Sequence, residues 1–190
     1  NGFAAALLPL AMTLGEDLYL EGVLSPHLLN GLEEYQRIQC AWEPTFFKPV
    51  SIGQDELQAA EVDASVPGVG CSFSGGVDSF HTLMSHLPQN EGNPSYRVSH
   101  CLMINGFDAD SDLESSGHFS RIQELMEPIF IEQGIELIVC RTNYMSFSDA
   151  WITKQSFGAM VTAPALVLGR LFSCFFIPSS YRFDSFFRDG

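Results

Sequence analysis

The sequence predicts an α/β protein built on an open parallel sheet with helices on both faces, a Rossmann-like arrangement, preceded by a small N-terminal α+β segment. From Val69 onward, short apolar runs alternate with stretches of helical periodicity, which is typical of strands joined by crossover helices. Before that point, one strand-like run leads into one helical stretch. We therefore expect a small N-terminal segment over 1–66 and the main domain over 67–190. A chain of 190 residues with 46% apolar content can bury one sizeable core, which agrees with a single main domain.

The N-terminal segment shows one strand and one well-marked helix start. Residues 18–24 form an apolar run that predicts a strand, and Ser25 and Pro26 supply the N-cap and the first-turn proline of a helix. The aromatic and proline-rich stretch 42–49 ends that helix. Its apolar face consists of residues at three- and four-residue spacing, namely Leu28, Leu29, Leu32 and Tyr35.

The main domain is predicted to alternate strands and helices up to its end. The expected strands are 69–73, 98–104, 135–140 and 174–178, and the expected helices are one from about 78, 118–133 and about 149–172. The helix 118–133 is the clearest, since Gly134 is a typical stop and its apolar residues lie on one stripe. These are Phe119, Ile122, Leu125, Met126, Ile129 and Phe130.

The chain is strongly acidic, with 23 acidic residues against 9 lysines and arginines and a net charge of -14. Little basic surface is left to neutralise a nucleic-acid backbone, so we expect no binding to RNA or DNA. The balance suits a phosphate site that works through Mg²⁺ and backbone amides. The 5 cysteines show no CxxC or zinc-type spacing, which indicates free thiols in a reducing compartment and hence a cytoplasmic location.

Two apolar stretches do not fit a membrane span. Residues 1–12 lack a basic flank and are too short to cross a bilayer, whereas Pro164 and Arg170 interrupt the stretch 159–177. We therefore expect neither a signal peptide nor a membrane partner.

In an open parallel sheet, ligands bind beyond the carboxyl ends of the strands, which here selects the loops 74–79, 105–108, 141–144 and 179–182. The first loop has the most specific chemistry. Two glycines let the backbone approach a ligand, and the following helix start directs its N–H groups at an anion. Serine hydroxyls at both ends of the loop can bond phosphate oxygens, and a carboxylate at the helix start implies an intervening Mg²⁺. The loop reads Ser74, Gly75, Gly76, Val77, Asp78 and Ser79.

Two other interpretations of this loop were weighed. It is not a Walker A loop, because the chain contains no GxxxxGK[ST] segment. An ordinary tight turn, with Ser74 and Asp78 as helix caps, explains the capping. It does not explain why two glycines, two serines and an aspartate occur together at a strand end where a ligand is expected.

The loop resembles the SGGxDS signature of the PP-loop ATP pyrophosphatases, the superfamily of asparagine synthetase, GMP synthetase, argininosuccinate synthetase and 7-cyano-7-deazaguanine synthase. A chance match of its five fixed positions is expected in roughly one of several thousand chains of this length. The resemblance extends more weakly over 69–182. It implies a five-stranded parallel sheet of the HUP type and cleavage of ATP between the α and β phosphates.

Site residues follow from the resemblance by matching position. It implies that pyrophosphate and Mg²⁺ are held by Ser74, Gly75, Gly76, Asp78 and Ser79, with Asp78 as the metal ligand. An adenine pocket is implied at the first strand, by Cys71 and Phe73, and at the end of the second, by Met103 and Asn105. The cysteine set of the deazaguanine synthases, a glutaminase domain and the positive charge of tRNA-modifying members are absent from the sequence. The match is therefore to the superfamily, and it identifies no acceptor.

Two arginines follow expected strands on the ligand edge. Arg141 or Arg182 would neutralise the charge that develops as the α–β bond breaks, and a surface arginine paired with a carboxylate is an equally good interpretation of each. The alternating Asp108, Asp110 and Asp112 suggest calcium. The remaining positions of that motif hold the wrong residues, so a solvated acidic loop is favoured.

The leading hypothesis is a domain that binds ATP and Mg²⁺, forms AMP and pyrophosphate, and adenylates a small-molecule acceptor for ligation or amidation. One alternative is a non-catalytic adenine-nucleotide-binding or interaction module. Another is an inactive fragment of a longer ligase that lacks C-terminal acceptor-binding elements, since the chain begins at Asn1 and stops at Gly190 just after a strand-like run.

Overall fold

The computed structural model describes residues 2–59, 68–107, 117–148 and 150–178. Contacts divide the chain into two compact units that interleave along the sequence. Unit 1 comprises residues 1–64 and 143–170, and unit 2 comprises residues 65–142 and 171–190. This division differs from the domain ranges predicted from the sequence, 1–66 and 67–190, because the segment 143–170 belongs to unit 1.

In its described residues, unit 1 combines four helical segments with a two-stranded parallel sheet. Its elements are α1 (Gly2–Leu14), β1 (Leu18–Leu24), α2 (Pro26–Trp42), β2 (Ile52–Leu57), the 3₁₀ turn η2 (Tyr144–Ser146) and α5 (Ala150–Val167). The predicted strand 18–24 is confirmed, and so is the helix start, where Ser25 Oγ accepts a hydrogen bond from Leu28 N at 3.2 Å. The pairing of β1 with β2 is parallel, and neither α1 nor β2 was expected.

The core of unit 1 lies between its helices and its small sheet. Helices α1 and α5 pack so closely that a side chain at Gly2 would collide with the Ala163 carbonyl. The most buried apolar side chains of this core include Leu8, Met12, Leu24 and Phe47.

Two polar atoms on one face of α2 are buried in unit 1. Tyr35 and Gln39 stand one helical turn apart, and within the described residues neither the Tyr35 hydroxyl nor Gln39 Oε1 has a hydrogen-bond partner. Burial, together with the nearby Tyr144 hydroxyl, raises the pKa of Tyr35. A buried hydroxyl without a partner costs about 1–3 kcal/mol.

Tyr35→Phe is therefore expected to stabilise the protein, because it removes a buried hydroxyl and keeps the ring. A gain of about 1 kcal/mol corresponds to a rise in Tm of about 2–4 °C in a chain of this size, measurable by differential scanning calorimetry. Tyr19→Phe is the matched control. Its hydroxyl donates to Asp55 Oδ1 at 2.6 Å, so its removal should not raise Tm. A fall in Tm for Tyr35→Phe would show that the hydroxyl is satisfied in solution.

The described residues of unit 2 form a four-stranded, entirely parallel sheet in the order β5-β4-β3-β6, with helices packed on it. Its strands are β3 (Gly68–Ser72), β4 (His100–Asn105), β5 (Glu136–Arg141) and β6 (Phe172–Phe176), and its helical segments are α3 (Val77–Ser85), the 3₁₀ turn η1 (Pro94–Tyr96) and α4 (Gly117–Gln133). The predicted α/β class and parallel sheet are confirmed, with element ends shifted by a few residues. The largest difference is α5, which ends at Val167 rather than near 172.

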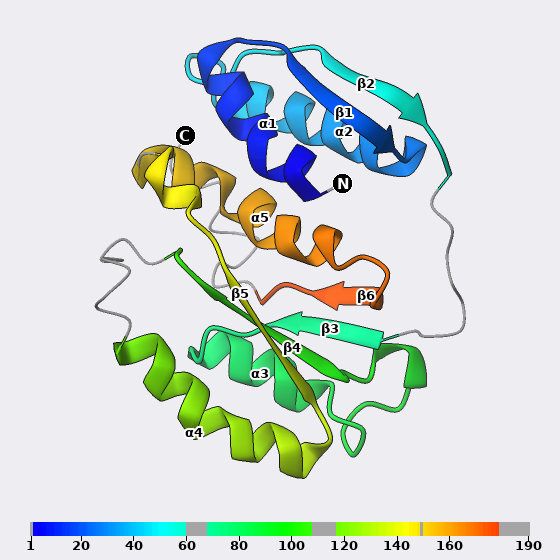
Figure 1. Cartoon of the computed structure of the whole chain (residues 1–190), viewed down its shortest axis with the longest axis vertical. Helices are drawn as coiled ribbons and strands as arrows, with labels where there is room; N and C mark the ends of the chain where they lie inside the picture. Colours follow the sequence, from blue (N-terminus) through cyan, green and yellow to red (C-terminus); the bar gives the residue numbers. More distant parts are fainter. Residues whose placement is uncertain (1, 60–67, 108–116, 149, 179–190) are drawn as a thin grey trace. The chain divides into compact units, whose positions relative to one another are not determined.

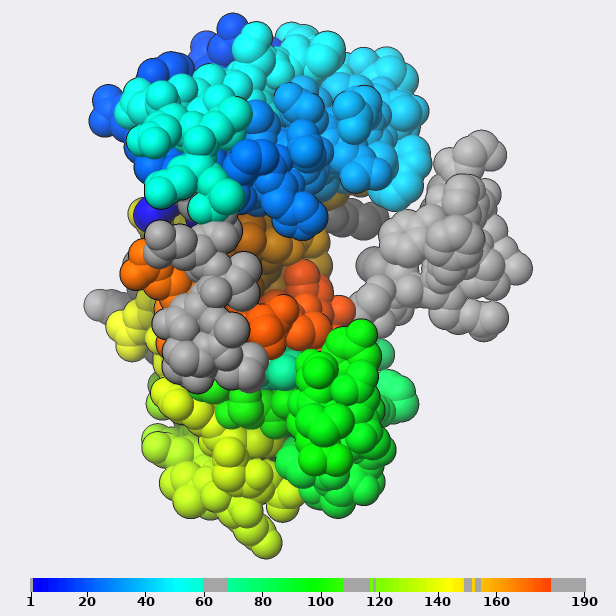
Figure 2. Space-filling model, turned by 90° about the vertical axis from the view of Figure 1, so that its right-hand side faces the viewer, coloured from blue at the N-terminus to red at the C-terminus, as the bar shows by residue number. Residues whose placement is uncertain are grey.

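Helices α3 and α4 cover the same face of the unit 2 sheet (Figure 1). Leu83 of α3 and Met126 and Phe130 of α4 pack with Phe73 and other strand residues into one buried cluster. The side of the sheet at which its strands begin faces the viewer in Figure 2. On this side the green segment after α3 lies beside the end of α4. There Gln89 Nε2 donates to Gln133 Oε1 at 3.0 Å. The carboxyl-terminal edge holds the loops predicted to bind a ligand.

Candidate functional site: the loop after β3

The loop 74–79 follows the strand at which the order of the sheet reverses. The chain places β4 and then β5 on one side of β3, and it later places β6 on the other side. In open parallel sheets, ligands bind at such a switch point, beyond the carboxyl ends of the strands. The structure therefore puts this loop where the topology favours a ligand.

The loop forms a compact turn between β3 and α3. Gly75 has a φ of 79°, in the left-handed region that favours glycine. The hydroxyl of Ser74 accepts a hydrogen bond from Gly76 N at 3.3 Å, and the hydroxyl of Ser79 donates to Gly76 O at 2.7 Å. These two bonds and the glycine conformation give the turn its shape.

The two serines of the loop differ in accessibility. Ser74 is exposed, as are Gly76 and Asp78, whereas the Ser79 residue is only 3% exposed. The hydroxyl of Ser79 is engaged within the turn. Ser74 is therefore placed to meet a ligand directly, and Ser79 would have to give up its bond to Gly76 to do so.

The start of α3 is open in the way an anion site requires. The N-cap residue is Gly76, which has no side chain to cap the helix. The first N–H groups of a helix have no partner within it and carry a partial positive charge. Because Ser74 Oγ bonds the N–H of the N-cap residue itself, Ser74 does not act as the helix cap that the tight-turn interpretation requires.

Two close packing contacts of this edge were not found from the sequence. A methyl group at Gly75 would lie 3.0 Å from Ile122 Cγ2, although the sequence placed Ile122 only in the apolar stripe of α4. Gly106, just after β4, has a φ of 111°, and a side chain there would collide with the Thr142 carbonyl. The only sequence signal was a glycine shortly after β3 and another directly after β4.

The residues implied for an adenine pocket differ in burial: three are buried and Asn105 is half-buried. The side chains of Cys71, Phe73 and Met103 are buried, at 0%, 2% and 1% exposure, in the cluster under α3 and α4. Burial raises the pKa of Cys71 to about 12, so this thiol stays protonated and unreactive at neutral pH. A base at this edge could reach these three residues only through their main chain. The adenine pocket implied at these strands stays a prediction.

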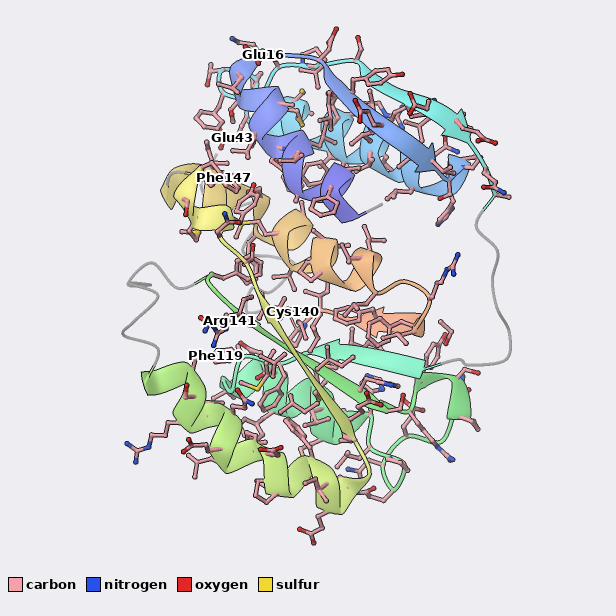
Figure 3. The ribbon with its side chains drawn as sticks, viewed as in Figure 1. Glu16, Glu43, Phe119, Cys140, Arg141 and Phe147 are labelled. Atoms are coloured by element: carbon pink, nitrogen blue, oxygen red, sulfur yellow. The ribbon has the colours of Figure 1, made fainter. Side chains whose placement is uncertain are left out.

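Asn105 and Arg141 come together at the ends of β4 and β5. They are register partners in the parallel ladder, and Thr142 N donates to Asn105 O at 2.9 Å. The Arg141 side chain is exposed. Figure 3 shows Arg141 at this edge of the sheet together with Phe119 at the start of α4. The guanidinium group therefore lies on the edge where the loop 74–79 emerges.

The remaining predicted residues lie outside the described part of the chain. These are Arg182 and the aspartates Asp108, Asp110 and Asp112.

The donor atoms of the loop fit a hard divalent cation bound together with phosphates. Among the described residues, no group of three His, Cys, Asp or Glu side chains is placed to hold a metal ion on its own. Mg²⁺ commonly uses one or two carboxylates, with phosphates and water as its other ligands. Asp78, the second residue of α3, supplies one such carboxylate beside the open helix start.

These observations define an α/β protein with a Rossmann-like parallel sheet and a glycine-containing loop at its switch point. None of the described helices is both long and apolar enough to span a membrane. No family model matches the chain, and no curated protein and no solved structure matches it either.

Proposed function

We propose that unit 2 is an ATP-binding domain of the PP-loop, HUP type that forms AMP and pyrophosphate and adenylates a small acceptor. The observation that carries this proposal is the position of the loop 74–79. The loop joins β3 to the uncapped start of α3, at the switch point of the sheet. The loop thus combines a family-like sequence with a location at which parallel sheets bind ligands. The described sheet has four strands, where the resemblance implies five.

The residues of the loop would act mainly by binding and by stabilising charge. The N–H groups around Gly75 and Gly76 and the hydroxyl of Ser74 would bind the pyrophosphate group as it leaves, and the Gly76 N–H would first have to give up its bond to Ser74 Oγ. When bound, Mg²⁺ would neutralise phosphate charge, with Asp78 as its protein ligand. An acceptor oxygen would bond to the α-phosphorus while the α–β bridging bond breaks, and Arg141 would offset the developing negative charge.

A product assay tests the reaction. The purified protein is incubated with ATP, Mg²⁺ and pools of small carboxylic and carbonyl compounds, and the products are separated by ion-exchange chromatography. AMP with pyrophosphate supports the proposal, whereas ADP with phosphate contradicts it. Binding of ATP without turnover would favour the second candidate, a nucleotide-binding module. The exposed loop with its open helix start also supports that function.

We expect ATP binding to require Mg²⁺ and to weaken strongly in EDTA. The net charge of -14 and the carboxylate of Asp78 at the helix start oppose an unshielded triphosphate. Isothermal titration calorimetry with and without the metal measures this difference directly. Equal affinity under both conditions would remove Asp78 from its proposed role.

A further inference from the structure

The loop after β3 rests on a side chain from a different helix. Ile122 of α4 lies beside Gly75, so that a methyl group on Gly75 would be 3.0 Å from Ile122 Cγ2 and 3.2 Å from its Cδ1. Both distances are shorter than ordinary van der Waals contacts to a Cβ atom. The isoleucine therefore occupies the space next to the glycine backbone.

Ile122 is suited to act as a rigid support. It is half-buried and packs against the cluster that also contains Met126 and Phe130 of the same helix. A β-branched side chain in a helix has one strongly preferred χ1 rotamer, so its position is set by α4. Gly75, by contrast, is a residue type with wide conformational freedom, held here at a φ of 79°.

The two sides of the loop are thus constrained by different means. On one side, the hydroxyl of Ser74 bonds Gly76 N. On the other, Ile122 restricts the space into which the Gly75 backbone can move. Preorganised N–H groups bind an anion more tightly than mobile ones, because less conformational entropy is lost on binding.

We propose that Ile122 is a positioning residue for the phosphate-binding loop, and that it couples binding at the loop to the packing of α4. This inference rests on the proposed function, because it takes the ligand of the loop to be a phosphate group. Ile122 itself touches no ligand. It acts by holding Gly75 in the left-handed conformation.

The first test compares the affinity of three variants for Mg²⁺-pyrophosphate by calorimetry, at a temperature well below each Tm. Ile122→Ala is expected to raise Kd about tenfold, because the loop samples more conformations before binding. Ile122→Val keeps the β-branch and should bind nearly as the wild type does. Leu125→Ala, on the same helix but 63% exposed, is the matched control and should not change Kd.

The second test needs no ligand. Gly75→Ala should lower Tm, both because alanine is strained at this φ and because its methyl group meets Ile122. In an Ile122→Ala background the second cause is removed, so the loss of Tm caused by Gly75→Ala should be smaller than in the wild type.

The outcomes separate the two proposals. If the wild type binds neither Mg²⁺-pyrophosphate nor Mg²⁺-ATP, the proposed function fails, and the positioning role fails with it. If the wild type binds but Ile122→Ala binds equally well at reduced Tm, the isoleucine is only structural and the proposed function stands. Additive losses of Tm in the double variant would also overturn the coupling, since they would show that residues 75 and 122 do not meet.

Discussion

Asp78→Asn is expected to leave the fold intact and to lower Mg²⁺-dependent turnover of ATP by about 10²–10³-fold. If the domain only binds nucleotide, the loss should appear in its affinity for Mg²⁺-ATP. Asparagine has nearly the same shape as aspartate but lacks the charge that a magnesium ligand requires. Residue 78 is exposed in the first turn of α3, where asparagine keeps the size and shape of the side chain. Thermal unfolding and an AMP-formation assay on the same sample measure both parts.

A matched control for this variant is Glu124→Gln. It removes one carboxylate from an exposed position of α4 and so makes the same change in net charge. The control should bind and turn over nucleotide as the wild type does. If Asp78→Asn melts at the wild-type temperature and keeps wild-type binding and turnover, the carboxylate does not hold the metal, and the loop is better explained as a structural turn.

Gly76→Ala is the second variant with a large expected effect, and it should impair binding without impairing folding. The φ of Gly76 is -82°, which any residue adopts, and a methyl group there would find Ser74 Oγ at 3.4 Å, an ordinary contact. On the exposed side, however, the methyl group would stand where a phosphate must approach the backbone N–H groups. We expect a loss of about 10²-fold in affinity for Mg²⁺-ATP, measured by calorimetry.

Gly31→Ala supplies the comparison for Gly76→Ala. Gly31 lies within α2, and a methyl group there meets nothing within 4 Å. Alanine in a helix interior is more stable than glycine by about 1 kcal/mol, so this variant should melt at a higher temperature and bind nucleotide unchanged. Wild-type affinity in Gly76→Ala would mean that no ligand reaches the backbone at this residue.

The parts of the fold that could be predicted are those with a clear period or end signal. The stripe of α4 and the Ser25-Pro26 start of α2 are of this kind, and both elements begin within one residue of their predicted positions. Helix α1 was missed because it is apolar on all sides and contains Pro9, so no stripe marks it as a helix. The strand β2, Ile-Gly-Gln-Asp-Glu-Leu, has too few apolar residues to stand out from a loop.

The loop 74–79 could be located from the sequence because its signal is local: an apolar strand, two glycines and a helix start follow one another directly. The contact of Ile122 with Gly75 and that of Gly106 with Thr142 join residues far apart in the chain. Periodicity does not contain such information. For the same reason, the alternation of strands and helices could not show that α5 packs against α1 and belongs to unit 1.

The interleaving of the two units makes them inseparable by a single cut in the chain. The polypeptide leaves unit 2 after Thr142, supplies η2 and α5 to unit 1, and returns at Leu171 to form β6, the strand next to β3. Unit 1 is in this sense completed by an insertion into unit 2. Removing residues 1–64 would leave α5 without α1 and would expose Ala163 and Leu166, which pack in the core of unit 1, to water. Deleting the segment 143–170 instead would leave α1 without α5, and β5 and β6 would have to be rejoined across β4 and β3 by a designed linker.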